Sequence, residues 1–261
     1  MKRTRLLECL RANPVFAELN NRALGELLNA ATQRTTLAGG LVVRQGDDAD
    51  LFGMLFSGRA KMVQVTHDGR QVLLRYIVAG QEFGLIAVLP GFTYPLTLEA
   101  VEDCEVLCWP GATLATFFAR YPQIALNALR IMVIRNQELQ ARYRELLTDR
   151  VEQRLARALV RLARVAGTAD AQGTLIALPL SREDLAELIG TTLYTVSRTL
   201  SQWEQAGFVA TGRERVVICA VDELEQIAGA PEPLPVSCAA PCALVEILSA
   251  ARTASTQTSG G

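Results

Sequence analysis

The sequence predicts an α+β protein in three parts: an N-terminal antiparallel β-roll, a long helix, and a C-terminal pair of short helices followed by a β-hairpin. Residues 35–110 alternate short β-branched and aromatic runs with glycines, which is typical of a compact antiparallel barrel or jelly roll. Residues 111–166 are strongly helical in pattern. Residues 180–209 have the spacing of two short helices joined by a tight turn.

Composition bounds the class of protein. The chain has 261 residues, 50% hydrophobic and 20% charged, enough for one large domain or two ordinary ones. No apolar run approaches the roughly 18 to 20 residues of a membrane span, and the first residues lack the apolar core of a signal peptide. We therefore expect a soluble, cytoplasmic protein with no membrane partner.

Charge is informative only locally. The net charge of −1 is no argument for a nucleic-acid partner. Residues 130–164, however, hold nine arginines and four acidic residues. This excess is either a solvated helix face or a surface that meets phosphates.

The sequence holds no recognisable catalytic or metal motif. The six cysteines include no C-x-x-C pair. Thiols in the core and in the C-terminal tail are therefore favoured over a metal-binding cluster of Cys104, Cys108, Cys238 and Cys242. The sequence identifies no metal. The one histidine, His67, lies in a predicted turn, and neither H-E-x-x-H nor a P-loop occurs. We expect a protein that is not an enzyme.

The N-terminal part is expected to begin with helices and continue as strands. Helical periodicity runs through residues 6–33 and is interrupted at Asn13-Pro14. Asp68-Gly69, between strand-like residues 61–66 and 71–77, predicts a hairpin turn. Further along, residues 167–173 are expected to form a loop before a strand at 174–180.

The long helix carries a dimerisation pattern. Seven residues recur at spacings of 4-3-4-3-4-3, as in a coiled-coil seam: Ala125, Leu129, Met132, Asn136, Leu139, Tyr143 and Leu146. A helix buried within one chain would show a wider apolar stripe, so a parallel homodimer is favoured.

The two short helices have clear ends. Ser181 with Asp184 forms a capping-box-like pair, Gly190 suits the left-handed residue after a helix, and Thr191 or Thr192 can cap the second helix. In that helix Val196, Leu200 and Trp203 form the expected buried stripe. The residues left to face outward are Leu193, Tyr194, Thr195, Ser197 and Arg198. This set has the composition of a recognition helix that enters a DNA major groove. The alternative is an ordinary helical hairpin whose polar face is only solvated.

The segment SREDLAELIG-TTLYTVSRTL-SQWEQAGFV resembles the winged helix-turn-helix of the CRP/FNR regulators, and the resemblance extends over roughly residues 12–225. It implies a sensor β-roll with N-terminal helices at 1–110, a dimerisation helix at 111–148 and a DNA-binding domain at 149–229. The Pro/Ala/Ser/Thr-rich composition after Ala230 predicts a flexible tail at 230–261. YPLTLEAVEDCEVLCW and TTLYTVSRTL are similar to the nitrogen-oxide-responsive branch exemplified by NnrR and DNR, which is thought to sense nitric oxide through haem.

The resemblance also implies the roles of the DNA-binding residues. Arg198 matches the base-contacting arginine and Ser197 the serine of the FNR pattern, while Tyr194 stands where FNR and CRP have a glutamate. Thr195 adjoins these positions on the same helix. Backbone phosphates would be clamped by Ser181, Arg182, Thr191 and Thr192, and reached from the wing by Arg213 and Arg215.

The segments LFSGRAKMVQ, DGRQVLLRYIVAGQEFG and LEAVEDCEVLCW resemble the cyclic-nucleotide-binding domain. At the positions of its ribose-binding glutamate and phosphate-binding arginine stand Leu85 and Tyr94. No Lys or Arg occurs between Arg75 and Arg120, and a buried phosphate needs a paired cation or an array of N–H donors. We expect no cyclic AMP binding.

An apolar effector pocket is expected in its place, formed by Phe83, Gly84, Leu85, Ile86, Tyr94 and Leu96. Three interpretations stay open: the pocket is filled by these side chains and binds nothing, it binds an apolar ligand, or it binds haem. Haem has no good axial ligand, because His67 is expected in an exposed turn, and the alternatives are Cys104, Cys108, Tyr94 and Met132. FNR holds an iron–sulfur cluster through N-terminal cysteines, where this chain has only Cys9, which counts against that cofactor.

The sequence thus predicts a dimeric, sequence-specific transcription regulator of the CRP/FNR type that binds an inverted-repeat operator in double-stranded DNA. RNA polymerase is a further candidate partner. The alternatives are a haem-dependent nitric oxide or redox sensor, and a ligand-binding regulatory module that does not act on DNA.

Overall fold

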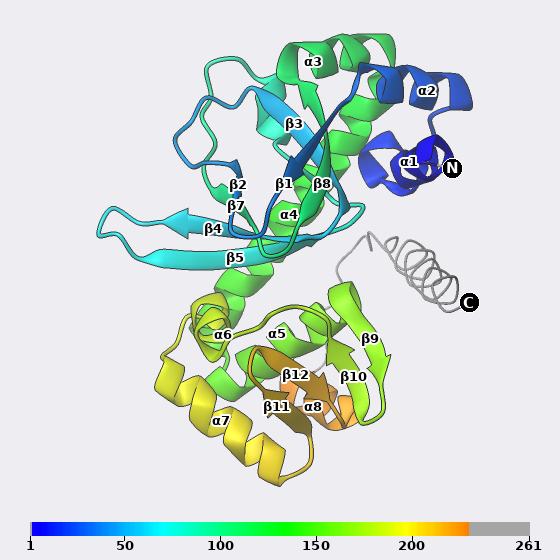
Figure 1. Ribbon diagram of the computed structural model, residues 1–261. Coiled ribbons are helices and arrows are strands. Elements are labelled where there is room, and N and C mark those ends of the chain that lie inside the picture. The colour runs from blue at the N-terminus through cyan, green and yellow to red at the C-terminus, as the bar shows by residue number, and fades with distance from the viewer. Residues whose placement is uncertain (1, 230–261) are drawn as a thin grey trace, which may run out of the picture. The chain divides into compact units, whose positions relative to one another are not determined.

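The structure, a computed structural model, describes residues 2–229 and divides them between two compact units. The first contains residues 2–62 and 76–134, and the second contains residues 63–75 and 135–229 (Figure 1). No helix among the described residues is long and apolar enough to cross a membrane. The expected flexible tail, with Cys238 and Cys242, lies outside the described residues.

The first unit begins with helices, as the periodicity predicts: α1 (Lys2–Ala12), the 3-10 helix η1 (Pro14–Phe16) and α2 (Asn21–Ala30). The predicted interruption at Asn13-Pro14 is present. The side chain of Asn13 accepts a hydrogen bond from the Val15 amide at 2.9 Å, and so caps η1 where the proline ends the preceding helix.

Eight strands then form the predicted antiparallel roll. They make two four-stranded sheets, ordered β1-β8-β3-β6 and β2-β7-β4-β5. The bounds are β1 (Thr32–Thr36), β2 (Leu41–Val43), β3 (Leu51–Ser57), β4 (Arg59–Val65), β5 (Gln71–Val78), β6 (Glu82–Phe83), β7 (Thr97–Ala100) and β8 (Cys104–Pro110), with the 3-10 helix η2 (Leu85–Val88) after β6. The predicted hairpin turn lies between β4 and β5, where Gly69 has φ +81.

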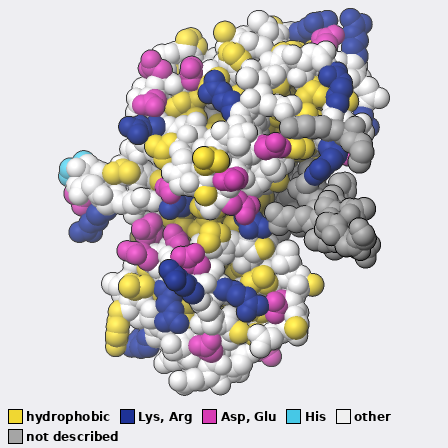
Figure 2. All heavy atoms as spheres, in the orientation of Figure 1, with side chains coloured by type: hydrophobic (Ala, Val, Ile, Leu, Met, Phe, Trp, Pro, Cys, Tyr) yellow, Lys and Arg dark blue, Asp and Glu magenta, His cyan; other side chains and the backbone are white. Residues whose placement is uncertain are grey.

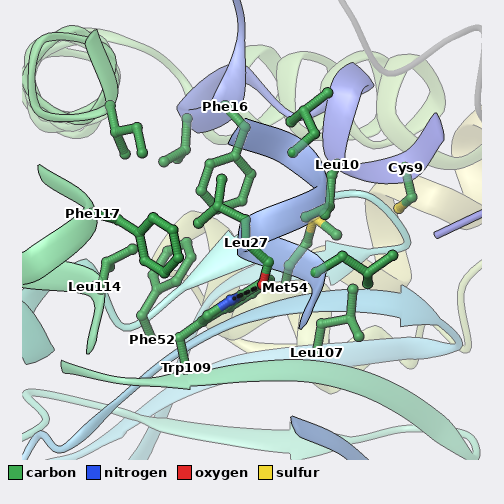
Figure 3. Packing of buried hydrophobic residues seen from close by; sticks show 14 of the residues in the cluster. Cys9, Leu10, Phe16, Leu27, Phe52, Met54, Leu107, Trp109, Leu114 and Phe117 are labelled. Carbon is green, nitrogen blue, oxygen red and sulfur yellow. Dashed lines mark hydrogen bonds between the residues drawn. The ribbon is translucent and has the colours of Figure 1, made fainter. Parts of the chain in front are cut away.

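Strand β8 separates two apolar clusters, because alternate residues of a strand point to opposite faces. Leu107 and Trp109 face the N-terminal helices, and the Trp109 indole donates to the Leu27 carbonyl at 2.9 Å (Figure 3). Cys104, Val106 and Cys108 face the interior of the roll. Both cysteines are therefore core thiols, as the sequence predicts.

The expected continuous helix over 111–148 is interrupted. It forms α3 (Gly111–Arg120) and α4 (Pro122–Thr148), separated by Tyr121 at φ −128 and ψ 78. A residue before proline is disfavoured in the α region, so Pro122 starts a new helix instead of continuing the first one.

The second unit holds α5 (Val151–Ala166), β9 (Gly167–Asp170), β10 (Gly173–Ile176), α6 (Arg182–Ile189), α7 (Leu193–Gln205), β11 (Val209–Gly212), β12 (Arg215–Ile218) and α8 (Val221–Ala228). Its sheet has the order β11-β12-β10-β9. The expected loop at 167–173 is wrong, because its first part pairs with β10 as strand β9. β9 is an edge strand with two exposed residues, so it lacks the apolar alternation by which a strand is recognised.

Candidate nucleic-acid interface

Helices α6 and α7 form the predicted pair, and short-range hydrogen bonds define the ends of both. The Ser181 amide donates to Asp184 Oδ2 at 2.9 Å, and the Asp184 amide donates to Ser181 Oγ at 2.9 Å. Gly190 ends α6 at φ 65 and ψ 55, in the left-handed region. Thr192, one of the two expected caps, accepts from the Thr195 amide at 3.2 Å.

The face of α7 that packs on its neighbours is the predicted one. Val196, Leu200 and Trp203 are buried. Thr199 is buried beside them and donates from its hydroxyl to the Thr195 carbonyl at 3.0 Å, which satisfies the polar group inside the helix. Burial of this stripe fixes which residues of α7 face outward.

The outward face begins at the first turn of α7. Leu193 is 50% exposed and Tyr194 is 76% exposed. Arg198 is exposed one turn later, beside half-buried Ser197. Thr195 is half-buried, and its hydroxyl lies 2.9 Å from the hydroxyl of Thr192.

Three of the four predicted phosphate contacts at these helix ends also have structural roles through their side chains. Ser181 belongs to the capping box, and Thr192 caps α7. Arg182 reaches the hydroxyl of Thr211 on β11 at 3.5 Å. Thr191, half-buried, lies in the turn and donates its amide to the Ala186 carbonyl at 2.9 Å.

Strands β11 and β12 form the predicted wing, with Gly212 paired to Arg215. Between them Arg213 is exposed, and Glu214 has a positive φ of 52. Arg215, also expected to reach phosphates, pairs with Asp170 at 2.7 Å and is 48% exposed. Within residues 3–229, Arg213 and Arg198 make no ion pair or hydrogen bond through their side chains.

The arginine-rich stretch before α6 is largely occupied by internal contacts. Arg161 binds Glu145 at 2.8 Å, and Arg157 binds Asp149 at 3.1 Å. Arg154 donates to the Ile189 carbonyl, at the end of α6, at 3.1 Å. These three arginines therefore hold α4, α5 and α6 together and are not free to meet phosphates. The sequence does not reveal these pairs, because Glu145 and Asp149 precede the break between α4 and α5, outside any i,i+4 pattern of α5.

Helix α4 has an exposed apolar face. Of the predicted seam residues, Ala125 is half-buried and the other six are exposed. The large apolar side chains exposed on α4 are Leu126, Leu129, Met132, Val133, Leu139, Tyr143, Leu146 and Leu147. Five of these eight belong to the seam, and Leu126, Val133 and Leu147 each widen it by one position.

The predicted effector side chains divide between two apolar clusters. Phe83 and Tyr94 are buried inside the roll, with Ile86 and Leu96 packed against them. Leu85 packs instead on the cluster beneath the N-terminal helices, and Gly84 precedes η2 at φ 72.

Tyr94 fills the position at which the resemblance predicts a phosphate-binding arginine. Its hydroxyl accepts from the Leu51 amide at 2.9 Å and donates to the Leu51 carbonyl at 2.7 Å. Burial raises the pKa of its phenol. The side chain is 4% exposed, so this part of the site is filled by a satisfied tyrosine.

A cavity of about 110 Å³ adjoins the roll interior and is lined by residues that include Arg34, Phe83 and Cys108. Ordinary small-molecule sites measure roughly 300 to 1,000 Å³. The cavity is thus well below the size that a nucleotide or haem requires.

Of the predicted axial ligands for haem, Cys108 alone lines this cavity. His67 is exposed in the β4–β5 turn, as predicted, and cyan marks it on the surface in Figure 2. Met132 is 50% exposed on α4. The Cys104 thiol donates to the Arg59 carbonyl at 3.2 Å, and burial raises its pKa to about 11.

No group of three or more metal-ligating side chains occurs in the part of the chain that the structure describes. Cys9, Cys104, Cys108 and Cys219 are all free thiols. Cys238 and Cys242 lie outside the described residues, so the four-cysteine cluster considered above stays untested.

Comparison with known proteins places both units in characterised families. Residues 33–121 match the cyclic nucleotide-binding domain, and residues 153–227 match the Crp-like helix-turn-helix domain. The chain is 28% identical over 222 residues to a "Probable transcriptional activator" of Rhizobium leguminosarum bv. viciae, covering 83% of this chain and 89% of that protein.

Two solved structures are similar over most of the described chain. A transcriptional regulator of the CRP family from Thermus thermophilus is 26% identical with a TM-score of 0.63, covering 77% of this chain and 99% of that one. FixK2 from Bradyrhizobium japonicum is 23% identical with a TM-score of 0.66, over 77% of this chain and 99% of that one, and it supports the fold alone.

Proposed function

The chain belongs to the CRP/FNR family of transcriptional regulators, and from this we propose that it binds an inverted-repeat operator as a homodimer in the cytoplasm. Each subunit would place α7 in the major groove and the β11–β12 wing against the backbone. Two-fold symmetry of the protein requires a matching symmetry in the DNA.

The observation that carries this proposal is the contrast among the arginines of the second unit. Arg154, Arg157, Arg161 and Arg215 are held by acids or carbonyls of the same unit. Arg198 and Arg213, by contrast, are exposed without such partners among residues 3–229. An unpaired guanidinium on a helix that can enter the groove suits guanine, and one at a wing tip suits phosphate.

The other predicted contact residues fit this orientation. Ser197 lies beside Arg198, and Tyr194 is one turn before it. Ser181, Arg182, Thr191 and Thr192 lie at the starts of α6 and α7, where helix N-termini meet phosphates. Tyr194 cannot accept from cytosine N4 as a carboxylate does, so the half-site is proposed to differ from the CRP and FNR sites at that base.

Binding is tested by selecting duplexes from a randomised inverted-repeat library with the full chain. For Arg198→Ala we expect an affinity loss of about 1–3 kcal/mol for the selected duplex, together with relaxed preference at one guanine. Arg22→Ala, on the 80% exposed Arg22 of α2, is the matched control and should bind like the wild type. Failure of the wild type to enrich any sequence would instead favour the regulatory module that does not act on DNA.

The dimer is proposed to form along α4. A row of exposed leucine, methionine and tyrosine side chains on one helix is unfavourable in a monomer, and the 4-3 spacing suits a partner helix. Leu139→Glu should shift the molecular mass measured by light scattering towards a monomer. Leu37→Glu is the control, since Leu37 at 68% and Leu139 at 66% are equally exposed. Equal masses for both variants would contradict this interface.

The sensor roll is proposed not to bind cyclic nucleotides. Tyr94 occupies the phosphate position, and the loop around it contains no Lys or Arg. Calorimetric titration with cyclic AMP and with cyclic GMP should give no saturable heat. A saturable isotherm for either nucleotide would overturn this part of the proposal.

The donor set does not fit haem either, because His67 and Met132 lie on the surface and Tyr94 and Cys104 are committed to carbonyl groups. Cys108 lines only the cavity of about 110 Å³, and burial raises the pKa of its thiol, which opposes the thiolate form that binds iron. Purified protein mixed with haem should show only the broad spectrum of unbound haem. A sharp Soret band that shifts with nitric oxide would restore the nitrogen-oxide-responsive branch as the better assignment.

A further inference from the structure

The first turn of α7 presents apolar side chains where a DNA-reading helix usually presents polar ones. Leu193 is 50% exposed and Tyr194 is 76% exposed. They are the first two helical residues after the cap Thr192. The residues at the N-terminus of a recognition helix are those that reach base edges.

The hydroxyl groups of Thr192 and Thr195, in the first turn of α7, take part in the cap of the helix. Thr192 Oγ1 accepts from the Thr195 amide at 3.2 Å, and the two threonine hydroxyls lie 2.9 Å apart. These contacts use one of the two hydroxyl protons, and the other remains available to a phosphate at the helix end. The large side chains that face outward in the first turn are the isobutyl group of Leu193 and the phenol ring of Tyr194.

One turn later the character of the same face changes. Leu193 is followed at i+4 by Ser197, and Tyr194 by Arg198, so the four side chains form an apolar pair next to a polar pair. Leucine has no donor or acceptor for the edge of a base. The one apolar group that the major groove displays is the C5 methyl of thymine.

We propose that Leu193, supported by the ring of Tyr194, reads thymine through its C5 methyl group. The half-site then carries a thymine next to the guanine that Arg198 contacts. This inference rests on the proposed function, because it assumes that α7 enters the major groove.

The test removes only the methyl group from the DNA. In the duplex selected by the full-length wild type, each thymine is replaced in turn by deoxyuridine, and affinity is measured by fluorescence anisotropy. Loss of one buried methyl should weaken binding about fourfold, and loss from both half-sites about fifteenfold. The effect should be confined to one or two positions per half-site.

Variants of the protein identify which side chain contacts the thymine methyl group. Leu193→Ala and Tyr194→Ala should bind the thymine and deoxyuridine duplexes with a smaller difference than the wild type, and Leu193→Ala should show almost none. Leu37→Ala, which removes an equally apolar and 68% exposed side chain from the first unit, should retain the full difference. Since Leu193 is on the surface, its removal is expected to leave the fold intact.

Two results would overturn the proposal while leaving the proposed function in place. The first is wild-type protein that binds its selected sequence equally well with thymine or deoxyuridine at every position. The second is an undiminished difference in both Leu193→Ala and Tyr194→Ala. If the library yields no selected sequence at all, the proposed function itself fails, and this inference fails with it.

Discussion

Arg161 holds both carboxylate oxygens of Glu145, with Nη1 at 2.8 Å from Oε1 and 3.0 Å from Oε2. The pair joins α5 to the last turns of α4 within the second unit. Arg157 adds a second cation at 3.7 Å from Glu145 and 3.1 Å from Asp149. This ionic cluster fixes how the end of the long helix meets the first helix of the DNA-binding region.

Glu145→Ala should lower the free energy of unfolding by about 2 kcal/mol, between the values for a buried and an exposed pair, because it leaves Arg161 without its nearly buried carboxylate partner. The side chain of Glu145 is only 10% exposed. Urea unfolding followed by circular dichroism measures the change. Glu225→Ala is the control: its partner Arg164 is 61% exposed, and an exposed pair contributes at most about 1 kcal/mol. Equal losses for the two variants would show that the cluster does not stabilise the unit.

Tyr94→Phe should destabilise the roll by about 1–3 kcal/mol, because it deprives the Leu51 amide and carbonyl of their shared partner. The tyrosine is buried, so water cannot replace the hydroxyl at no cost. Thermal unfolding checks this. Tyr194→Phe, on a 76% exposed side chain, should leave the melting temperature unchanged, and a comparable fall in both would contradict the role given to the Tyr94 hydroxyl.

Gly190→Ala and Gly25→Ala should have opposite effects on stability. At Gly190 the backbone is left-handed, with φ +65, and an added Cβ would lie 3.0 Å from Leu146 Cδ2, so alanine is expected to cost about 1–2 kcal/mol. At Gly25, inside α2, nothing lies within 4 Å of an added Cβ, and alanine should stabilise by about 0.5–1 kcal/mol. Urea titrations of both variants decide the matter, and a stabilised Gly190→Ala would refute the left-handed cap.

The buried thiols should resist alkylation at pH 8. Burial raises the pKa of Cys9 and of Cys104 from 9.0 to about 11, so both remain protonated there, and the thiolate is the reactive form. Among the four cysteines of residues 3–229, half-buried Cys219 should be labelled first by iodoacetamide, as mapped by mass spectrometry. Equally fast labelling of Cys9 would contradict its burial.

The same thiols link stability to alkaline pH. Their folded pKa is higher than the unfolded value, so the contribution is fully present below pH 9.0 and is lost as pH rises through about 11. Stability measured by urea unfolding should therefore fall across this window. The fall should be smaller in Cys9→Ala than in the wild type.

Sequence alone predicted the features that depend on neighbouring residues. The capping box of Ser181 with Asp184, the left-handed Gly190 and the Asp68-Gly69 hairpin are all encoded within a few residues. The buried stripe of α7 also followed from spacing alone, because a helix repeats its faces regularly. The break at Tyr121-Pro122 was equally local, and the proline should have revealed it.

Other features depend on residues that are distant in the chain, and only the tertiary structure decided them. Strand β9 forms because it pairs with β10. Arg161 is ion-paired because the turn between α4 and α5 brings the carboxylate of Glu145 within 2.8 Å of its guanidinium. Sequence identified Tyr94 as a departure from the cyclic-nucleotide pattern, but its hydrogen bonds to Leu51 require the folded roll. The sequence determined where helices start, stop and turn their faces, whereas folding determined which charged groups are paired internally and which remain exposed at the surface.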